Sequence, residues 1–127
     1  MILKILILPI YSICQHIRNK VLKFLYYAVF CQRSLRAHGK ACIINPKNIT
    51  MGKNCSINPS VYINAMNPVR IGNNVTLSAG CSVISASLDI ESFLAGGHAH
   101  VKNQGINIGN NVWIGANATI LGGKIYM

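Results

Sequence analysis

A short motif recurs three times in this chain and constrains its fold more than any other feature. The windows are Met51-Gly-Lys-Asn-Cys55, Ile71-Gly-Asn-Asn-Val75 and Ile108-Gly-Asn-Asn-Val112. Counting from the first residue of each window, apolar residues of small or medium size stand four, six, ten and twelve positions further on. They are Cys55, Ile57, Val61 and Ile63 for the first window, Val75, Leu77, Cys81 and Val83 for the second, and Val112, Ile114, Ala118 and Ile120 for the third. Self-similarity of this kind predicts one structural unit stacked on copies of itself.

The recurrence of apolar residues at a spacing of six predicts a solenoid with three walls. A short strand and a turn take about six residues, so about eighteen residues return the chain to its starting wall. Gly and Asn follow the apolar residue of each window, and both are typical of tight turns with positive φ. We therefore predict an all-β solenoid domain of about three coils over residues 41–127.

One interval in the repeat is too long for a single coil. The step from Ile71 to Ile108 exceeds the step from Met51 to Ile71 by nearly another coil. The extra residues predict a loop ejected between about Ser85 and Gly105, which contains both acidic residues of the chain and two of its four histidines. A long loop in an otherwise regular domain usually carries function.

Residues 1–40 follow a different pattern and are predicted to form a basic helical segment. Over Tyr11–Leu35, apolar residues recur three or four apart among Arg18, Lys20 and Lys23, which is typical of an amphipathic helix. Eight of the twelve Lys and Arg precede the first repeat window, so the net charge of +10 is mainly N-terminal. Such a helix lies on an anionic membrane surface or packs on the main domain, and the pattern leaves both alternatives open.

The opening apolar run, Met1–Ile13, is interpreted as neither a membrane span nor a cleaved signal. It is shorter than the roughly 20 apolar residues that cross a bilayer. It also contains a proline and lacks a small-residue cleavage site. We expect a cytoplasmic protein, with peripheral contact to the cytoplasmic membrane through the N-terminal helix as an open alternative.

The five cysteines predict neither a disulfide framework nor a metal site. Their number is odd, and no C-x-x-C pair or histidine stands at ligand spacing. Cys55 and Cys81 occupy inward repeat positions and are expected to be core residues. His16 and His38 have no partner at a recognisable spacing and are expected on the surface. Despite the basic charge, no aromatic-basic motif indicates nucleic-acid binding.

Residues 106–123 read Ile-Asn-Ile-Gly-Asn-Asn-Val-Trp-Ile-Gly-Ala-Asn-Ala-Thr-Ile-Leu-Gly-Gly. This stretch closely resembles the hexapeptide-repeat acyltransferases, and the resemblance covers about residues 43–123. Within that family it is most similar to the branch of the maltose and galactoside acetyltransferases and of enzymes of capsule or lipopolysaccharide assembly. The resemblance implies a left-handed parallel β-helix. The handedness comes from the family alone, because parallel strands are usually connected by right-handed crossovers.

The resemblance also implies an activity and an assembly. The activity is acetyl transfer from acetyl-CoA, the acyl donor, to a hydroxyl of a sugar or surface-polysaccharide intermediate. The sites would lie at the seams of a homotrimer, with a loop histidine as general base. An alcohol must lose its proton as it attacks the thioester, and a neutral imidazole can accept that proton near pH 7. The mechanism requires no covalent enzyme intermediate, and no metal is expected.

The candidate catalytic residues all lie in the ejected loop. In many relatives a His-Asp pair follows the preceding coil, whereas this chain has Leu88-Asp89 there. Either the loop is rearranged so that His100 or His98 serves as the base, or the base is missing. We rank His100 above His98, because it is nearer the point where the chain re-enters the coil. Asp89, with Glu91 as a second candidate, would orient the imidazole or contact the sugar. Alternatively, these side chains only decorate a loop.

The candidate acetyl-CoA-binding residues are Trp113, Gly115 and Ala116. Trp113 matches the family's tryptophan near the groove for the pantetheine arm, and the two small residues would present backbone groups to the cofactor. The alternative is a tryptophan that packs on the solenoid surface or at the trimer seam.

The repeat is lost after Gly123, where the sequence reads Lys-Ile-Tyr-Met. The family continues with further coils that complete the acyl-CoA channel, so we expect the domain to be incomplete at its C-terminus. The alternatives to an active transferase are therefore an inactive truncated remnant of such an enzyme, or a structural or membrane-surface-associated solenoid.

Overall fold

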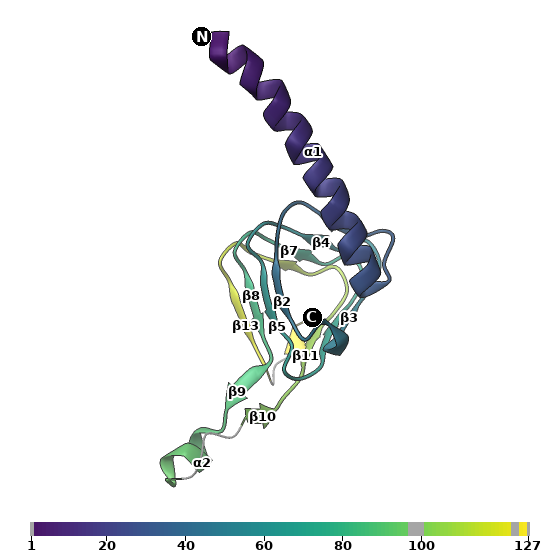
Figure 1. Cartoon of the computed structure of the whole chain (residues 1–127). Helices are drawn as coiled ribbons and strands as arrows, with labels where there is room; N and C mark the ends of the chain where they lie inside the picture. Colours follow the sequence, from purple (N-terminus) through teal and green to yellow (C-terminus); the bar gives the residue numbers. More distant parts are fainter. Residues whose placement is uncertain (1, 97–100, 123–124, 127) are drawn as a thin grey trace.

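The computed structural model describes residues 2–96, 101–122 and 125–126. Figure 1 shows a long N-terminal helix, a stack of short strands wound around a common axis, and a lateral excursion on one side of the stack. We refer to the wound strands as the strand stack.

Three parallel sheets form the walls of the strand stack. Sheet A consists of β1 (Arg36–Ala37), β4 (Ser56–Ile57), β7 (Thr76–Leu77) and β12 (Trp113–Ile114). Sheet B consists of β2 (Cys42–Ile44), β5 (Tyr62–Asn64), β8 (Ser82–Ile84) and β13 (Thr119–Leu121). Sheet C consists of β3 (Ile49–Met51), β6 (Val69–Ile71), β11 (Ile106–Ile108) and β14 (Ile125–Tyr126), and the short 3-10 helix η1 (Pro46–Asn48) precedes β3. The chain visits sheets A, B and C in turn, which is consistent with the predicted solenoid.

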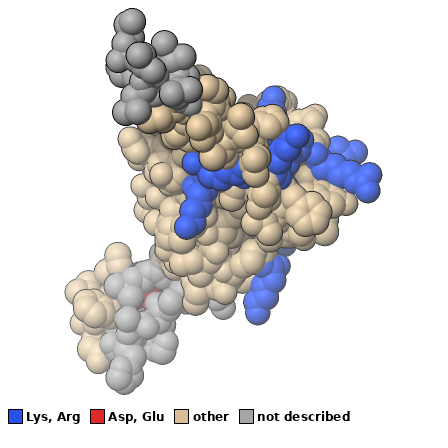
Figure 2. Space-filling model, turned by 45° about the horizontal axis from the view of Figure 1, so that its top comes forward, with Lys and Arg blue, Asp and Glu red and all other residues tan. Residues whose placement is uncertain are grey.

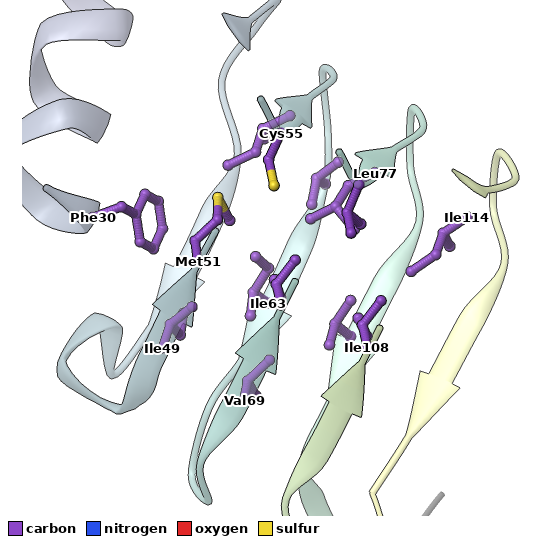
Figure 3. Close-up of a cluster of buried hydrophobic side chains, with 14 of the residues drawn as sticks. Phe30, Ile49, Met51, Cys55, Ile63, Val69, Leu77, Ile108 and Ile114 are labelled. Carbon is purple, nitrogen blue, oxygen red and sulfur yellow. The ribbon is translucent and has the colours of Figure 1, made fainter. Parts of the chain in front are cut away.

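The predicted inward residues form columns in the interior of the stack. In sheet A, Ile57 pairs with Leu77 and Leu77 with Ile114, so equivalent side chains of successive coils lie in register. Figure 3 shows Leu77 and Ile114 pointing into the same interior. All the predicted inward residues are buried except Val112 and Ala118, which are partly buried against the same core. Each fully buried aliphatic side chain stabilises the fold by about 1.5–3 kcal/mol.

The glycines of the first two windows allow the backbones of neighbouring coils to approach closely. A Cβ on Gly52 would lie 2.6 Å from the carbonyl oxygen of Gly72, and one on Gly72 would lie 2.6 Å from that of Gly109. Both distances are below any ordinary contact distance. Neither Gly52 nor Gly72 has a positive φ, so the sequence requires glycine here for space and not for an unusual backbone angle.

The second and third windows each contain two asparagines, and the two have different structural roles. The first caps the preceding coil: Lys53 N–H donates to Asn73 Oδ1 at 2.7 Å, and Asn73 N–H donates to Asn110 Oδ1 at 2.7 Å. The second turns the chain, because Asn74 and Asn111 have φ angles of 56° and 59°. Asparagine tolerates this left-handed conformation better than other residues with a Cβ. Asn54 has a φ angle of 57° in the first window, so asparagine makes the predicted positive-φ turn in all three windows.

Helix α1 (Ile2–Phe30) is longer than predicted at its N-terminus and ends before Leu35. It continues through Pro9, which lies inside the helix. Within the described residues, α1 included, no helix combines the length and hydropathy that a bilayer crossing requires. The strand stack begins at Arg36, upstream of the predicted residue 41, because Ala37 of β1 pairs with Ile57 of β4 and packs against the core at the equivalent repeat position.

The last turns of α1 close the first coil of the strand stack. Tyr26 and Phe30 are buried, as is Leu35 just after the helix. The Tyr26 hydroxyl accepts the Ala41 N–H at 2.8 Å, and Figure 3 shows Phe30 on the side of the first coil where Met51 lies. The helix thus covers apolar core that would otherwise be open at this end of the stack.

Substitution of Gly72 by alanine should destabilise the strand stack. The added Cβ must displace the backbone of the next coil, so we expect the free energy of unfolding to fall by about 2–3 kcal/mol, in the range of overpacked cores. Urea denaturation measures this change. Gly115→Ala is the matched control, because nothing lies within 4 Å of a Cβ at that position. Equal stability of the two variants would contradict the close-approach explanation.

Candidate functional site

The ejected loop forms an excursion with its own secondary structure. It consists of β9 (Ala86–Leu88), α2 (Ile90–Leu94) and β10 (Val101–Asn103), and β9 pairs with β10 in antiparallel register. The excursion leaves after β8 of sheet B and returns at β11 of sheet C, so it projects from the corner between these sheets (Figure 1). The predicted position of the loop is confirmed.

The two stems of the excursion are fixed to the coil before it. Ser85 is fully buried; its N–H donates to the Asn64 carbonyl at 2.9 Å, and its carbonyl accepts the Asn67 side-chain amide at 2.8 Å. At the other stem, Ile106 N–H donates to the Pro68 carbonyl at 2.9 Å. A buried serine with satisfied hydrogen bonds costs little, whereas an unsatisfied one would be expensive. The excursion therefore starts from a firmly held base.

The structure places the two acidic candidates of the predicted catalytic set but neither histidine. Asp89 is half-buried between β9 and α2, and its carbonyl accepts the Phe93 N–H at 3.0 Å. Glu91 is exposed on α2. His98 and His100 lie outside the described residues. Asp89 is thus held at the N-terminal end of α2, on the hairpin that leads toward both histidines.

Trp113 presents its indole to solvent on sheet A. The side chain is 79% exposed, yet its Nε1 donates to Ser78 Oγ of the preceding coil at 2.7 Å. Gly115 and Ala116 are exposed just after β12 and border the same part of the surface. Within this chain, Trp113 is therefore not packed into the stack, and it is available to a ligand or to another subunit.

One group of predicted site residues lies on the strand stack and the other on the excursion. Trp113, Gly115 and Ala116 belong to sheet A and the turn that follows it. The excursion that carries Asp89 projects from the corner between sheets B and C. The described part of one chain does not bring the two groups into one site.

The excursion carries an apolar surface that its sequence does not make evident. Ile90, Phe93 and Leu94 of α2 are all exposed, Leu94 by 78%. Their spacing of three and four residues is the available signal, but five helical residues are too few for a periodicity to be recognised. These three side chains form an exposed apolar patch, which is a candidate interaction surface.

The structure places Cys55, Cys81, His16 and His38 as the sequence predicts. Cys55 and Cys81 are buried, and burial raises the pKa of both thiols. His16 and His38 are exposed. Among the described residues, no group of three or more His, Cys, Asp or Glu side chains could hold a metal ion.

A comparison with known protein families finds no family model that matches this chain.

Thiol alkylation should separate the cysteines into two classes. Cys14, Cys31 and Cys42 are exposed and should react with iodoacetamide at pH 8 in the native protein. Cys55 and Cys81 should react at least about tenfold more slowly, because burial blocks access and the raised pKa reduces the thiolate fraction. Peptide mass spectrometry follows each site, with urea-unfolded protein as the control. Equal native rates at all five would contradict their core placement.

Proposed function

We propose that this chain is an acetyl-CoA-dependent O-acetyltransferase that acts on a sugar or surface-polysaccharide intermediate. The observation that carries the proposal is the order of two elements: an excursion with two histidines and an acid, followed directly by the coil that contains Trp113 and Gly115. The same order occurs in the hexapeptide-repeat acetyltransferases that the sequence resembles. The proposal includes a left-handed winding of the strand stack, as in that family.

The donor side of the site is the exposed surface around Trp113. The indole is held in place by its hydrogen bond to Ser78, so an elongated pantetheine arm can lie against it without ordering it first. Gly115 has no neighbour within 4 Å of a Cβ, which leaves room for the arm to approach the backbone. Backbone amides there would hydrogen-bond the amides of the arm.

The acceptor side is the excursion. In the proposed step, the imidazole of His100 removes the proton of the sugar hydroxyl as the oxygen attacks the thioester carbonyl. The tetrahedral intermediate then collapses, the C–S bond breaks, and the CoA sulfur leaves with the proton returned by the imidazolium. Asp89, held at the base of α2, would orient the imidazole. His98 is the alternative base.

The separation of the two groups favours a site shared between subunits. Sheet A of one chain would face the excursion of its neighbour in a homotrimer, so that Trp113 and the loop histidine meet across the seam. The apolar side chains of α2 would then pack on the neighbouring subunit, which accounts for their exposure in a single chain. We place the activity in the cytoplasm, where acetyl-CoA is available as donor.

An acetyl-CoA titration tests the donor side without knowledge of the acceptor. A ligand that binds only the folded state stabilises it by RT ln(1 + [L]/Kd), about 2.7 kcal/mol at 100 times Kd. We expect a saturable rise in Tm for the wild type and about a tenfold weaker apparent affinity for Trp113→Ala. Leu121→Ala is the control, since Leu121 is also exposed on the stack. An equal effect of both substitutions, or no rise at all, would refute the proposed cofactor site.

The general base is tested separately by mutation of the two loop histidines. His100→Ala should lower kcat by about 100-fold or more, since general-base catalysis contributes that much, while the acetyl-CoA-induced Tm shift stays unchanged. His98→Ala should have a much smaller effect. Loss of turnover only in His98→Ala would transfer the role to His98, and full activity in both variants would reject a histidine base.

A further inference from the structure

Most of α1 projects from the strand stack and carries apolar side chains in contact with solvent (Figure 1). A continuous stripe along it, which we call the α1 stripe, follows spacings of three and four residues. It consists of Ile10, Ile13, Ile17, Val21 and Phe24, each more than half exposed. Soluble domains rarely leave a contiguous apolar surface of this length in water, so the stripe marks an interaction site.

The α1 stripe is not the surface by which the helix packs on the strand stack. That task belongs to Leu22, Tyr26 and Phe30, which recur every four residues and contact the core. With about 100° of rotation per residue, these three side chains lie on roughly the opposite side of the helix from the stripe. The helix therefore uses one side for the stack and leaves the other free.

The part of α1 that meets the strand stack is rich in Lys and Arg, and no acidic residue lies near it in the sequence. Arg18, Lys20, Lys23, Arg33 and Arg36 are exposed at or near the part of the helix that meets the stack. The only two acids of the chain are in the excursion. Figure 2 shows Lys and Arg gathered over the end of the molecule where the helix joins the stack. This end therefore attracts an anionic surface.

Cationic and aromatic side chains meet in a pocket beside the α1 stripe. The pocket has a volume of about 340 Å³ and is lined by Lys20, Lys23, Phe24, Tyr27 and Arg33. Arg33 Nε donates to the Tyr27 hydroxyl at 3.3 Å, and its guanidinium carbon lies 5.7 Å from the centre of that ring. Ammonium and guanidinium groups suit a lipid phosphate, and the aromatic rings suit the glycerol and upper acyl region.

We propose that α1 docks this protein on a membrane that contains anionic phospholipid. The apolar N-terminal half of the helix enters one leaflet, and the positively charged region where the helix joins the strand stack lies among the headgroups. Residues 2–17 extend about 24 Å at 1.5 Å per residue, more than the roughly 15 Å of hydrocarbon in one leaflet, so the segment lies obliquely within that leaflet. This inference is independent of the proposed acetyltransferase activity.

The composition of the helix favours lipid over a second copy of the chain. Pairing of two helices would bury the α1 stripe, but Leu8 and Tyr11, which point to other sides, would stay in water. It would also bring basic residues together without any acid on either helix. A lipid leaflet covers apolar side chains on every side and supplies the negative charge.

Sedimentation of the full chain with vesicles tests the proposal. We expect binding to vesicles of phosphatidylcholine with about 30 mol % phosphatidylglycerol, at least about tenfold weaker binding to phosphatidylcholine alone, and weakening as salt is raised. Lys23→Glu should reduce binding to the anionic vesicles by about tenfold, whereas Arg70→Glu, the same charge change at an exposed site on β6, should change it less than about threefold. Absence of binding to anionic vesicles, or equal effects of the two substitutions, would overturn the proposal.

A second pair of variants tests insertion of the α1 stripe. Ile13→Ser with Ile17→Ser should abolish vesicle binding, because both apolar side chains would enter the leaflet. Met66→Ser with Leu121→Ser, which changes exposed apolar residues on the strand stack, should leave binding intact. The point variants keep the residues by which α1 packs on the first coil. Binding that survives in the Ile13/Ile17 variant would rule out insertion.

A tryptophan reporter distinguishes lipid from a second copy of the chain. Phe24→Trp in a Trp113→Phe background places the single tryptophan of the protein on the α1 stripe. With anionic vesicles its emission should shift to the blue and be quenched by brominated lipid. A blue shift without vesicles, together with an oligomer by light scattering that Ile13→Ser with Ile17→Ser dissolves, would assign the stripe to helix pairing and overturn the membrane proposal.

Discussion

The close approach of successive coils is the constraint on which the rest of this structure depends. Parallel strands of neighbouring coils pair in register, and Gly72 can lie against Gly109 only because it has no side chain. The neighbouring Asn73 and Asn110 then fill the hydrogen bonds that the turns leave open. The same register puts Ile57, Leu77 and Ile114 in one column, so backbone pairing and core packing reinforce each other.

A regular stack of this kind gives a stable base for irregular elements. The excursion begins and ends at residues that are hydrogen-bonded to the preceding coil, Ser85 and Ile106, and so it can carry polar side chains without loosening the core. Trp113 also departs from the repeat, because a large aromatic residue stands where the preceding coil has Thr76. The proposed chemistry thus uses the two places where the chain departs from its own repeat.

The acidic and the basic residues of the chain lie in different places, and each place is the site of one of the two proposals. Both acids lie in the excursion, where the proposed acceptor site needs a carboxylate, and the basic residues gather where α1 leaves the stack. Membrane docking through α1 would keep the excursion, and Trp113 of the strand stack, outside the segment that enters the membrane. The proposed acetyl transfer and the proposed membrane docking therefore use different residues of the chain and can occur together.

The sequence by itself determined the repeat, the inward residues and the position of the excursion, because apolar spacing and turn residues report directly on local backbone geometry. It also indicated the roles of Cys55 and Cys81. Only the tertiary structure decided where α1 ends and that Trp113 lies on the strand stack whereas Asp89 lies on the excursion. These outcomes depend on contacts between distant residues, such as Tyr26 with Ala41, which no local pattern contains. The apolar side of α1 was visible in the sequence, but its exposure follows from which side the strand stack covers.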